Sequence, residues 1–165
     1  MEKATFAAGC FWGVEDYFLR NVNGVVDTVV GFTGGHMDLS GTREPYKLVC
    51  TDKTGHAEAV EITFNPDVVS YETLVETFFH IHDPTQKNRQ GPDVGTQYRS
   101  VIFYHDDTQR EIATAVRDSI NAAKVFKKPI VTEIVEATEF YQAEDYHQKY
   151  IQKNGDHGCL TYIPF

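Results

Sequence analysis

The chain has 165 residues, enough for one domain with a sizeable core, and its hydrophobic and charged fractions of 41% and 24% are those of globular proteins. Its formal net charge of −9, with no basic cluster beyond Lys127-Lys128, argues against a nucleic acid or an anionic membrane as partner. No apolar run approaches the roughly 18 residues of a membrane span, and nothing resembles a secretion signal, so we expect a cytoplasmic protein.

Residues 3–8 are predicted to form a short strand, and the apolar spacing of Phe11, Val14 and Phe18 predicts a helix directly after it. Between the two lies Gly9-Cys10-Phe11-Trp12-Gly13, which joins a nucleophile to the chain's one tryptophan. Cys10 would lie at the first turn of the helix, where unpaired N–H groups and the positive end of the helix dipole favour a thiolate. Because the thiolate is the reactive form of cysteine, Cys10 is a candidate nucleophile.

Two simpler interpretations of Cys10 compete with this one. A free cysteine is most often a small buried core residue. The run Ala7-Ala8-Gly9-Cys10 also resembles the processing site before a lipid-modified cysteine, but the apolar segment of about seven or more residues that such a site needs is lacking. Cys10, Cys50 and Cys159 form neither a complete disulfide framework nor a C-x-x-C zinc motif, which fits a reducing compartment.

The next elements are a turn at residues 21–24, a β-branched strand over residues 25–33, and a loop rich in Gly, Ser and Thr that runs to Tyr46. Residues 46–51 are equally compatible with a short helix and with an extended segment. Cys50 has apolar neighbours there and is expected to be a packing residue.

Residues 55–64 carry the clearest strand pattern, because Val60 and Ile62 alternate with polar residues. Counting back in steps of two places Glu58 on this apolar face. An ionised carboxylate facing a core is costly, so the pKa of Glu58 would rise and the group would hold a proton. The alternative is that Glu58 lies at the strand end, where the same face opens to water, and the pattern favours neither.

Ser70 is predicted to cap a helix over residues 71–82 with a continuous apolar face. Residues 83–97 follow as a loop with almost no apolar content, and irregular loops of this length in compact domains are usually functional or disordered. The remaining predicted elements are a strand over 98–104, an amphipathic helix over 107–127, a strand over 129–136, an aromatic-rich segment over 140–150 that is helical in its second half, and an irregular tail from 154.

This order of strands and helices indicates an α+β fold, a two-layer sandwich with a mixed β-sheet, helices packed on it and a ferredoxin-like core. We expect a single domain over residues 1–165, with a core over about 3–153 and a flexible tail over 154–165.

Five side chains are possible metal ligands, namely His56, Glu58, His80, His82 and Asp83. His80 and His82 are two residues apart, so they diverge on the predicted helix, which counts against a shared site. No metal is therefore expected.

The segment Gly9-Cys10-Phe11-Trp12-Gly13 resembles the signature of the A-type peptide methionine sulfoxide reductases. The resemblance continues in the order of the family through five further blocks, at residues 31–35, 54–60, 82–86, 95–100 and 143–148. One block would be suggestive, whereas six in sequence are specific, and they identify Cys10 and Glu58 as site residues.

The resemblance implies reduction of the S epimer of methionine sulfoxide, free or in proteins, to methionine. In the family, the counterpart of Cys10 attacks the sulfoxide sulfur and the counterpart of Glu58 protonates its oxygen. The implied substrate-binding residues are Phe11, Trp12, Tyr46, Asp93 and Tyr98. The sulfenic acid left on Cys10 would be resolved by Cys159 as a disulfide, which thioredoxin or another dithiol would then reduce.

The tail departs from the family pattern, because Gly158 stands where many members have an aromatic residue before the resolving cysteine. Cys50 therefore stays an alternative resolving cysteine. Two other function classes stay open: a non-catalytic module that binds oxidised or methionine-bearing peptides through Phe11 and Trp12, and a cysteine hydrolase, although no protease signature is found. The expected partners are oxidised proteins, methionine sulfoxide and thioredoxin, with no bound cofactor, and a monomer is expected.

Overall fold

The structure is a computed structural model that describes residues 1–155 and 162–165. In chain order, its elements are β1 (Glu2–Ala8), α1 (Phe11–Asn21), β2 (Val25–Thr33), α2 (Pro45–Val49), β3 (Ala57–Phe64), α3 (Tyr71–His80), β4 (Arg89–Gln90), β5 (Asp93–Val94), the 3₁₀ helix η1 (Thr96–Tyr98), β6 (Ser100–Tyr104), α4 (Asp107–Ala122), β7 (Glu133–Glu136), β8 (Tyr141–Gln142), the 3₁₀ helix η2 (Asp145–His147) and α5 (Tyr150–Asn154).

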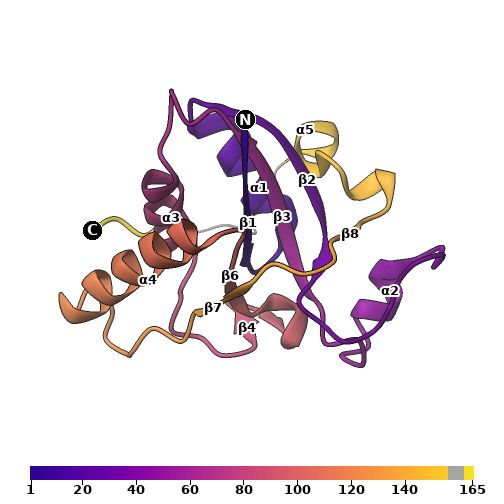
Figure 1. Ribbon diagram of the computed structural model, residues 1–165. Coiled ribbons are helices and arrows are strands. Elements are labelled where there is room, and N and C mark those ends of the chain that lie inside the picture. Colours follow the sequence, from indigo (N-terminus) through magenta and orange to yellow (C-terminus); the bar gives the residue numbers. More distant parts are fainter. Residues whose placement is uncertain (156–161) are drawn as a thin grey trace.

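Among the described residues, six strands form one sheet in the order β7-β6-β1-β3-β2-β8 (Figure 1). β6 and β7 pair in parallel, and the other neighbouring strands pair antiparallel, which confirms the mixed sheet. The segment β1-α1-β2-β3-α3-β6, with the spatial order β6-β1-β3-β2, is the βαββαβ arrangement of a ferredoxin-like core. The predicted α+β fold is therefore confirmed.

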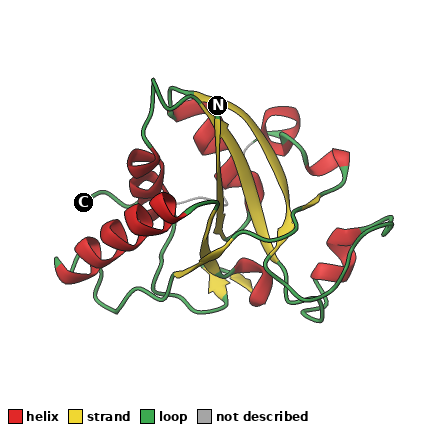
Figure 2. Ribbon diagram, viewed as in Figure 1, coloured by secondary structure: helices red, strands yellow, loops and turns green. Residues whose placement is uncertain are grey.

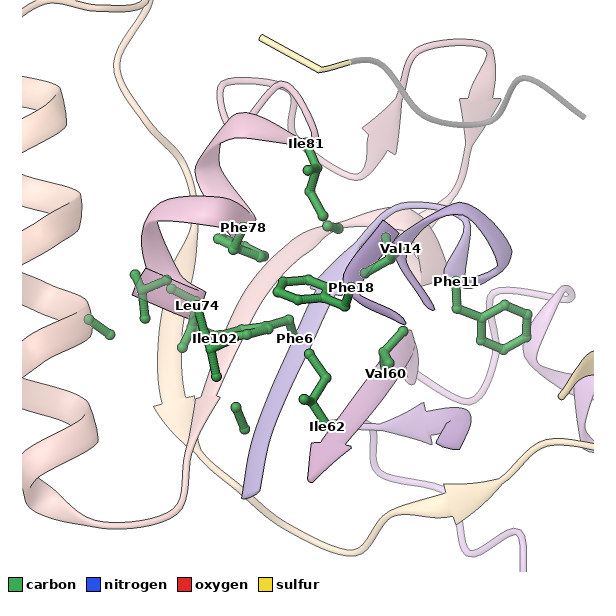
Figure 3. Close-up of a cluster of buried hydrophobic side chains, with 14 of the residues drawn as sticks. Phe6, Phe11, Val14, Phe18, Val60, Ile62, Leu74, Phe78, Ile81 and Ile102 are labelled. Atoms are coloured by element: carbon green, nitrogen blue, oxygen red, sulfur yellow. The ribbon is translucent and has the colours of Figure 1, made fainter. Parts of the chain in front are cut away.

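The main core lies between one face of the sheet and the helices. Phe18 of α1 and Phe78 of α3 both pack on Phe6 of β1, with ring centroids 5.7 and 5.2 Å apart, so both helices cover the same face (Figure 3). α4 lies beside α3 and packs against β6 and β7, while α2 stands at the other end of the molecule (Figure 2). The opposite face carries a smaller cluster around Ala59, Val101 and Phe103.

The helix predicted over residues 107–127 is shorter in the structure, because α4 ends at Ala122. Lys124 has the left-handed φ of 54°, which stops helical hydrogen bonding. The chain is then held by the side chain of Asn121, whose Oδ1 accepts from Ile130 N–H at 3.1 Å. The strand predicted from residue 129 consequently begins only at Glu133.

Three further segments differ from or sharpen the predictions. Residues 46–51 fall mostly in a short helix, α2, and the predicted loop over 83–97 contains the hairpin β4-β5 and most of η1. The second half of 140–150 forms one 3₁₀ turn rather than a helix, because Lys149 adopts a left-handed φ of 55° before α5 begins. Beyond the undescribed residues, Phe165 stacks on the ring of His80 with centroids 3.8 Å apart. None of the helices in the described part of the chain has the length and apolar character that a membrane crossing requires.

Candidate active site

Cys10 lies at the turn from β1 into α1, where it caps the N-terminus of the helix. Gly9 makes this turn possible, because its φ of +91° is one that other residues rarely adopt and an added Cβ would lie 2.8 Å from Gln90 of β4. Cys10 itself is partly exposed. Cys10 thus stands at the positive end of α1, where the sequence pattern predicted it and where a thiolate is favoured.

Glu58 is enclosed next to this helix start, with only 2% of its surface exposed. Its Oε1 accepts a hydrogen bond of 3.3 Å from the backbone N–H of Phe11, the first residue of α1. Its partner across the sheet is Phe32 of β2. The structure therefore decides between the two interpretations of the strand pattern: the carboxyl is buried on the core side, beside the residue that follows Cys10.

Two phenols, those of Tyr46 and Tyr98, lie close enough to this carboxyl to interact with its charge. Burial raises the pKa of Tyr46 above its ordinary value, and the charge of Glu58 adds to the rise. Burial also raises the pKa of Tyr98, and the charge of Glu58 is the next largest cause of this rise. The charges of Asp93 and Cys10 make smaller contributions in the same direction. Both phenols therefore keep their protons at neutral pH, so that each can donate a hydrogen bond to a bound oxygen atom.

Phe11 and Trp12 form an aromatic wall with two different parts. Phe11 is buried, packs on Phe32 with ring centroids 5.6 Å apart, and lies at the edge of the core (Figure 3). Trp12 is partly exposed, and its indole stacks on Tyr150 of α5 at 3.9 Å with the planes 10° apart. Trp12 therefore offers the accessible aromatic surface, which Phe11 supports from the core.

Most of the residues predicted from the sequence meet around the start of α1, and these are Cys10, Phe11, Trp12, Tyr46, Glu58, Asp93 and Tyr98. Cys159 lies outside the described residues. A surface hollow of about 770 Å³ over α2 is lined by none of them, so we do not assign it to the site.

The prediction that Cys50 is a packing residue is wrong, because Cys50 is exposed at the C-terminal end of α2. Neighbouring residues on a helix point in different directions, and the buried position goes to Val49. The thiol of Cys50 lies one helical turn from Tyr46, beside its phenol. Desolvation of this thiol raises the pKa of Cys50, although a hydrogen bond with Tyr46 opposes the rise. A second, protonated thiol therefore lies at the edge of the site.

His147 also lies against the aromatic wall, although no pattern in the sequence predicted a role for it. The Nδ1 of His147 accepts a hydrogen bond of 3.0 Å from the indole N–H of Trp12. Behind it, the backbone N–H of Lys149 donates to the buried carboxylate of Glu15 at 2.6 Å. The one signal in the sequence was the resemblance block at 143–148, which marks the segment but not the contact across 135 positions.

The three histidines weighed as metal ligands are engaged at separate places in the fold. His56 contacts the backbone carbonyl of Met37 through Nε2 at 2.6 Å, and His80 contacts a C-terminal carbonyl through Nδ1 at 2.6 Å. His82 contacts the hydroxyl of Ser100 at 2.7 Å, and burial lowers the pKa of His82 to about 4. Within the described residues, no three side chains of His, Cys, Asp or Glu are grouped to hold a metal ion.

Comparison of the sequence with known protein families and proteins identifies the family of this chain. The family model described as Peptide methionine sulfoxide reductase matches residues 2–164. The chain belongs to this family. A peptide methionine sulfoxide reductase MsrA of Methanosarcina acetivorans is 60% identical over 94% of this chain and 80% of its own length. The MsrA of Acidobacterium capsulatum is 56% identical over 96% of this chain and 99% of its own.

The fold of the family is also found in solved structures. Mxr1 from Saccharomyces cerevisiae in reduced form is 36% identical, with a TM-score of 0.90 over 99% of this chain and 92% of that one. The resemblance inferred from the six sequence blocks is therefore confirmed, and so is the prediction of an oxidoreductase. The two other function classes, a peptide-binding module and a hydrolase, find no support among these relatives.

Proposed function

We propose that this chain reduces the S epimer of methionine sulfoxide, free or in oxidised proteins, with Cys10 as the nucleophile. The observation that carries the proposal is the grouping of a partly exposed thiol at a helix N-terminus with the buried carboxyl of Glu58. Membership of the family supplies the substrate class, because the relatives are named for this reaction.

In the first step, the Cys10 thiolate attacks the sulfoxide sulfur while Glu58 gives a proton to the sulfoxide oxygen. Protonation makes sulfur a better electrophile, and a general acid of this kind contributes about 10²–10⁴-fold. The oxygen passes to the sulfur of Cys10, so the substrate is reduced to methionine and Cys10 is oxidised to a sulfenic acid. Tyr46 and Tyr98 hold the oxygen through their protonated phenols, and Asp93 supports Tyr98.

The methyl group of the substrate lies against Trp12 in this proposal. An indole face is a suitable apolar surface for a methyl group, and stacking on Tyr150 keeps the indole in place. Phe11 stiffens the wall through its packing on Phe32.

The second step needs a second thiol, and we assign it to Cys159. Its thiolate attacks the sulfur of the sulfenic acid, a disulfide with Cys10 forms, and water leaves. Cys50 is the poorer candidate, because desolvation raises the pKa of its thiol and leaves little thiolate near neutral pH. The yeast relative Mxr1 has been solved in complex with Trx2, which supports a thioredoxin as the dithiol that reopens the bond.

This chemistry needs no bound cofactor, because the two electrons come from the external dithiol. It suits a reducing compartment such as the cytoplasm. A monomer is sufficient, because all the assigned site residues belong to one chain.

The test is to mix the reduced protein with one equivalent of the S sulfoxide, or of the R sulfoxide, and to measure methionine and map disulfides by mass. We expect about one methionine per protein from the S sulfoxide only, and a bond between Cys10 and Cys159. Cys159→Ser should still release one methionine and then stop when thioredoxin is the only reductant. A mapped bond between Cys10 and Cys50, or normal turnover of Cys159→Ser with thioredoxin, would show that the resolving cysteine is misassigned.

A further inference from the structure

His147 lies at the centre of the aromatic side chains of the site, yet the proposed reaction gives it no role. His147 is only 1% exposed, and its ring centroid lies 4.4 Å from that of Tyr46 and 5.4 Å from that of Phe11. It also accepts the indole hydrogen bond of Trp12. One histidine thus contacts three residues from two helices that the proposed function assigns to substrate.

The hydrogen bond from Trp12 fixes the protonation state of this ring. An indole N–H can only donate, so Nδ1 of His147 must be without a proton. The single hydrogen of the neutral ring is therefore on Nε2. That atom is buried and has no hydrogen-bond partner among the described residues. An unsatisfied buried donor lowers the stability of the folded state. Such unsatisfied buried groups are rare, and a functional role is one of their explanations.

The chain directly after His147 is held in place by hydrogen bonds to α1 and β2. The side-chain amide of Gln148 accepts from the N–H of Val30 and donates to its C=O, both at 2.9 Å. The N–H of Lys149 donates to Glu15, whose carboxylate also accepts from the hydroxyl of Thr28 at 2.6 Å. His147 is therefore presented to Trp12 from a fixed segment.

Burial, and not the titratable groups around the ring, favours the neutral form of His147. On its own segment these are Tyr146 and Glu144, on α2 Tyr46, and on α5 Tyr150, which covers another face of Trp12. Burial lowers the pKa of His147, and the carboxylate of Glu144 opposes this only in part. The phenols of Tyr46 and Tyr146 stay protonated, because the pKa of both is raised above the ordinary phenol value.

We propose that His147 is a positioning residue that holds Trp12 in the orientation in which it receives the substrate, and that only the neutral tautomer with its hydrogen on Nε2 does so. Protonation of Nδ1 turns the acceptor into a donor, breaks the bond to Trp12 and releases the indole. The kinetic part rests on the proposed function, since it assumes that Trp12 binds substrate. The bond itself can be observed without any substrate.

The chain offers an unusually direct probe, because Trp12 is its one tryptophan. The protein therefore gives a single indole N–H signal in a ¹⁵N–¹H NMR spectrum. His147→Asn keeps an acceptor near the place of Nδ1 and cannot be protonated, whereas His147→Gln moves the amide toward the place of Nε2. We expect the wild-type indole signal to shift as the pH falls below the usual histidine range, the Asn variant to keep the neutral-pH position at every pH, and the Gln variant to lose it.

A second histidine serves as the matched control. Burial also lowers the pKa of His105, which pairs with Thr5 and lies outside the site. His105→Gln should leave both the indole signal and its pH dependence unchanged. This control excludes His105 as the source of the shift, and the constant signal of the Asn variant excludes a general acid-induced change.

In turnover, the loss of one orienting hydrogen bond should raise KM for methionine sulfoxide by about tenfold in His147→Gln, with kcat changed less than about twofold. The KM of the wild type should rise at acid pH, because protonation of His147 breaks the same hydrogen bond. The KM of His147→Asn should stay within about threefold of the wild-type value and should not rise at acid pH.

The proposal would be overturned by a wild-type indole signal that does not shift with pH. A Gln variant whose indole signal keeps the wild-type position would overturn it as well. So would a Gln variant with unchanged KM and only a lower unfolding midpoint. If the Gln variant does not fold, the wild-type and Asn titrations still decide. An indole titration as expected in a protein that does not reduce the sulfoxide would instead contradict the proposed function and leave the positioning bond intact.

Discussion

Cys10 and Cys50 lie beside the same two groups but at opposite ends of helices. The charges of both cysteines raise the pKa of Tyr98. Glu58 accepts a hydrogen bond from Phe11, the residue after Cys10, and its charge raises the pKa of Cys50. Cys10 is the N-cap residue of the 11-residue helix α1, whereas Cys50 is the C-cap residue of the five-residue helix α2. The two thiols therefore differ clearly in their places on the backbone.

A helix N-terminus presents unpaired N–H groups and partial positive charge, and a C-terminus presents carbonyls and partial negative charge. The thiolate of Cys10 is therefore stabilised by its own backbone, and that of Cys50 is not. Desolvation also raises the pKa of Cys50 above the ordinary thiol value. Local chain geometry thus favours Cys10 over Cys50 as the nucleophile of the proposed reaction.

The largest expected effect comes from removing the two thiols separately. Cys10→Ser should abolish methionine formation, since a serine hydroxyl is neither ionised nor nucleophilic enough to attack the sulfoxide. Cys50→Ser should keep turnover with thioredoxin within about twofold of wild type, because that thiol stays protonated. Methionine release measured by chromatography checks both. Equal losses in the two variants would break the comparison.

The shared carboxyl gives the next largest effect. Glu58→Gln should slow the first turnover by about 10²–10⁴-fold, because an amide can accept from Phe11 N–H but cannot deliver the acidic proton. Glu61→Gln is the matched control on the same strand, where it removes an ion pair with Lys3 on the other face. Rapid-quench measurement of methionine decides. A Glu58→Gln rate within twofold of wild type would mean that the proton comes from another group.

Alkylation of the resting protein measures the contrast directly. With iodoacetamide at neutral pH, Cys10 should react about tenfold faster than Cys50, and peptide mass mapping should separate the two sites. Because the pKa of Cys50 is raised, its rate should go on rising at pH values above about 8.5, the usual thiol range, so the ratio narrows as the pH increases. Equal rates across this range would contradict the role given to the helix N-terminus.

The smallest expected effect concerns the turn that places Cys10. Gly9→Ala should lower the free energy of unfolding by about 1–3 kcal/mol, because it combines a strained positive φ with a collision against Gln90. Gly41→Ala shares the strain, with a φ of +75°, but has open space around its Cβ position. Urea denaturation of both variants separates strain from collision. Equal losses would show that the contact with β4 has no effect on this turn.

The sequence alone was sufficient where local patterns carry the information. The glycine before Cys10 and the apolar spacing after it predicted the helix start, and the period of two in β3 placed Glu58 on the apolar face. The Ser70 cap was also predicted, and its side chain accepts from Thr73 N–H in the structure. These features depend on residues a few positions apart, which is why the pattern contains them.

Only the tertiary structure decided the features that depend on distant segments. Whether Glu58 faces a closed core or open water depends on α1 and β2 covering it, and the same strand pattern fits both. The hydrogen bond between Trp12 and His147 spans 135 positions, and the contact between Glu15 and Lys149 spans 134. No local periodicity encodes such pairs, because they form only when the sheet and α1 bring the two ends of the chain together, and this packing surrounds Cys10 with the residues of the candidate site.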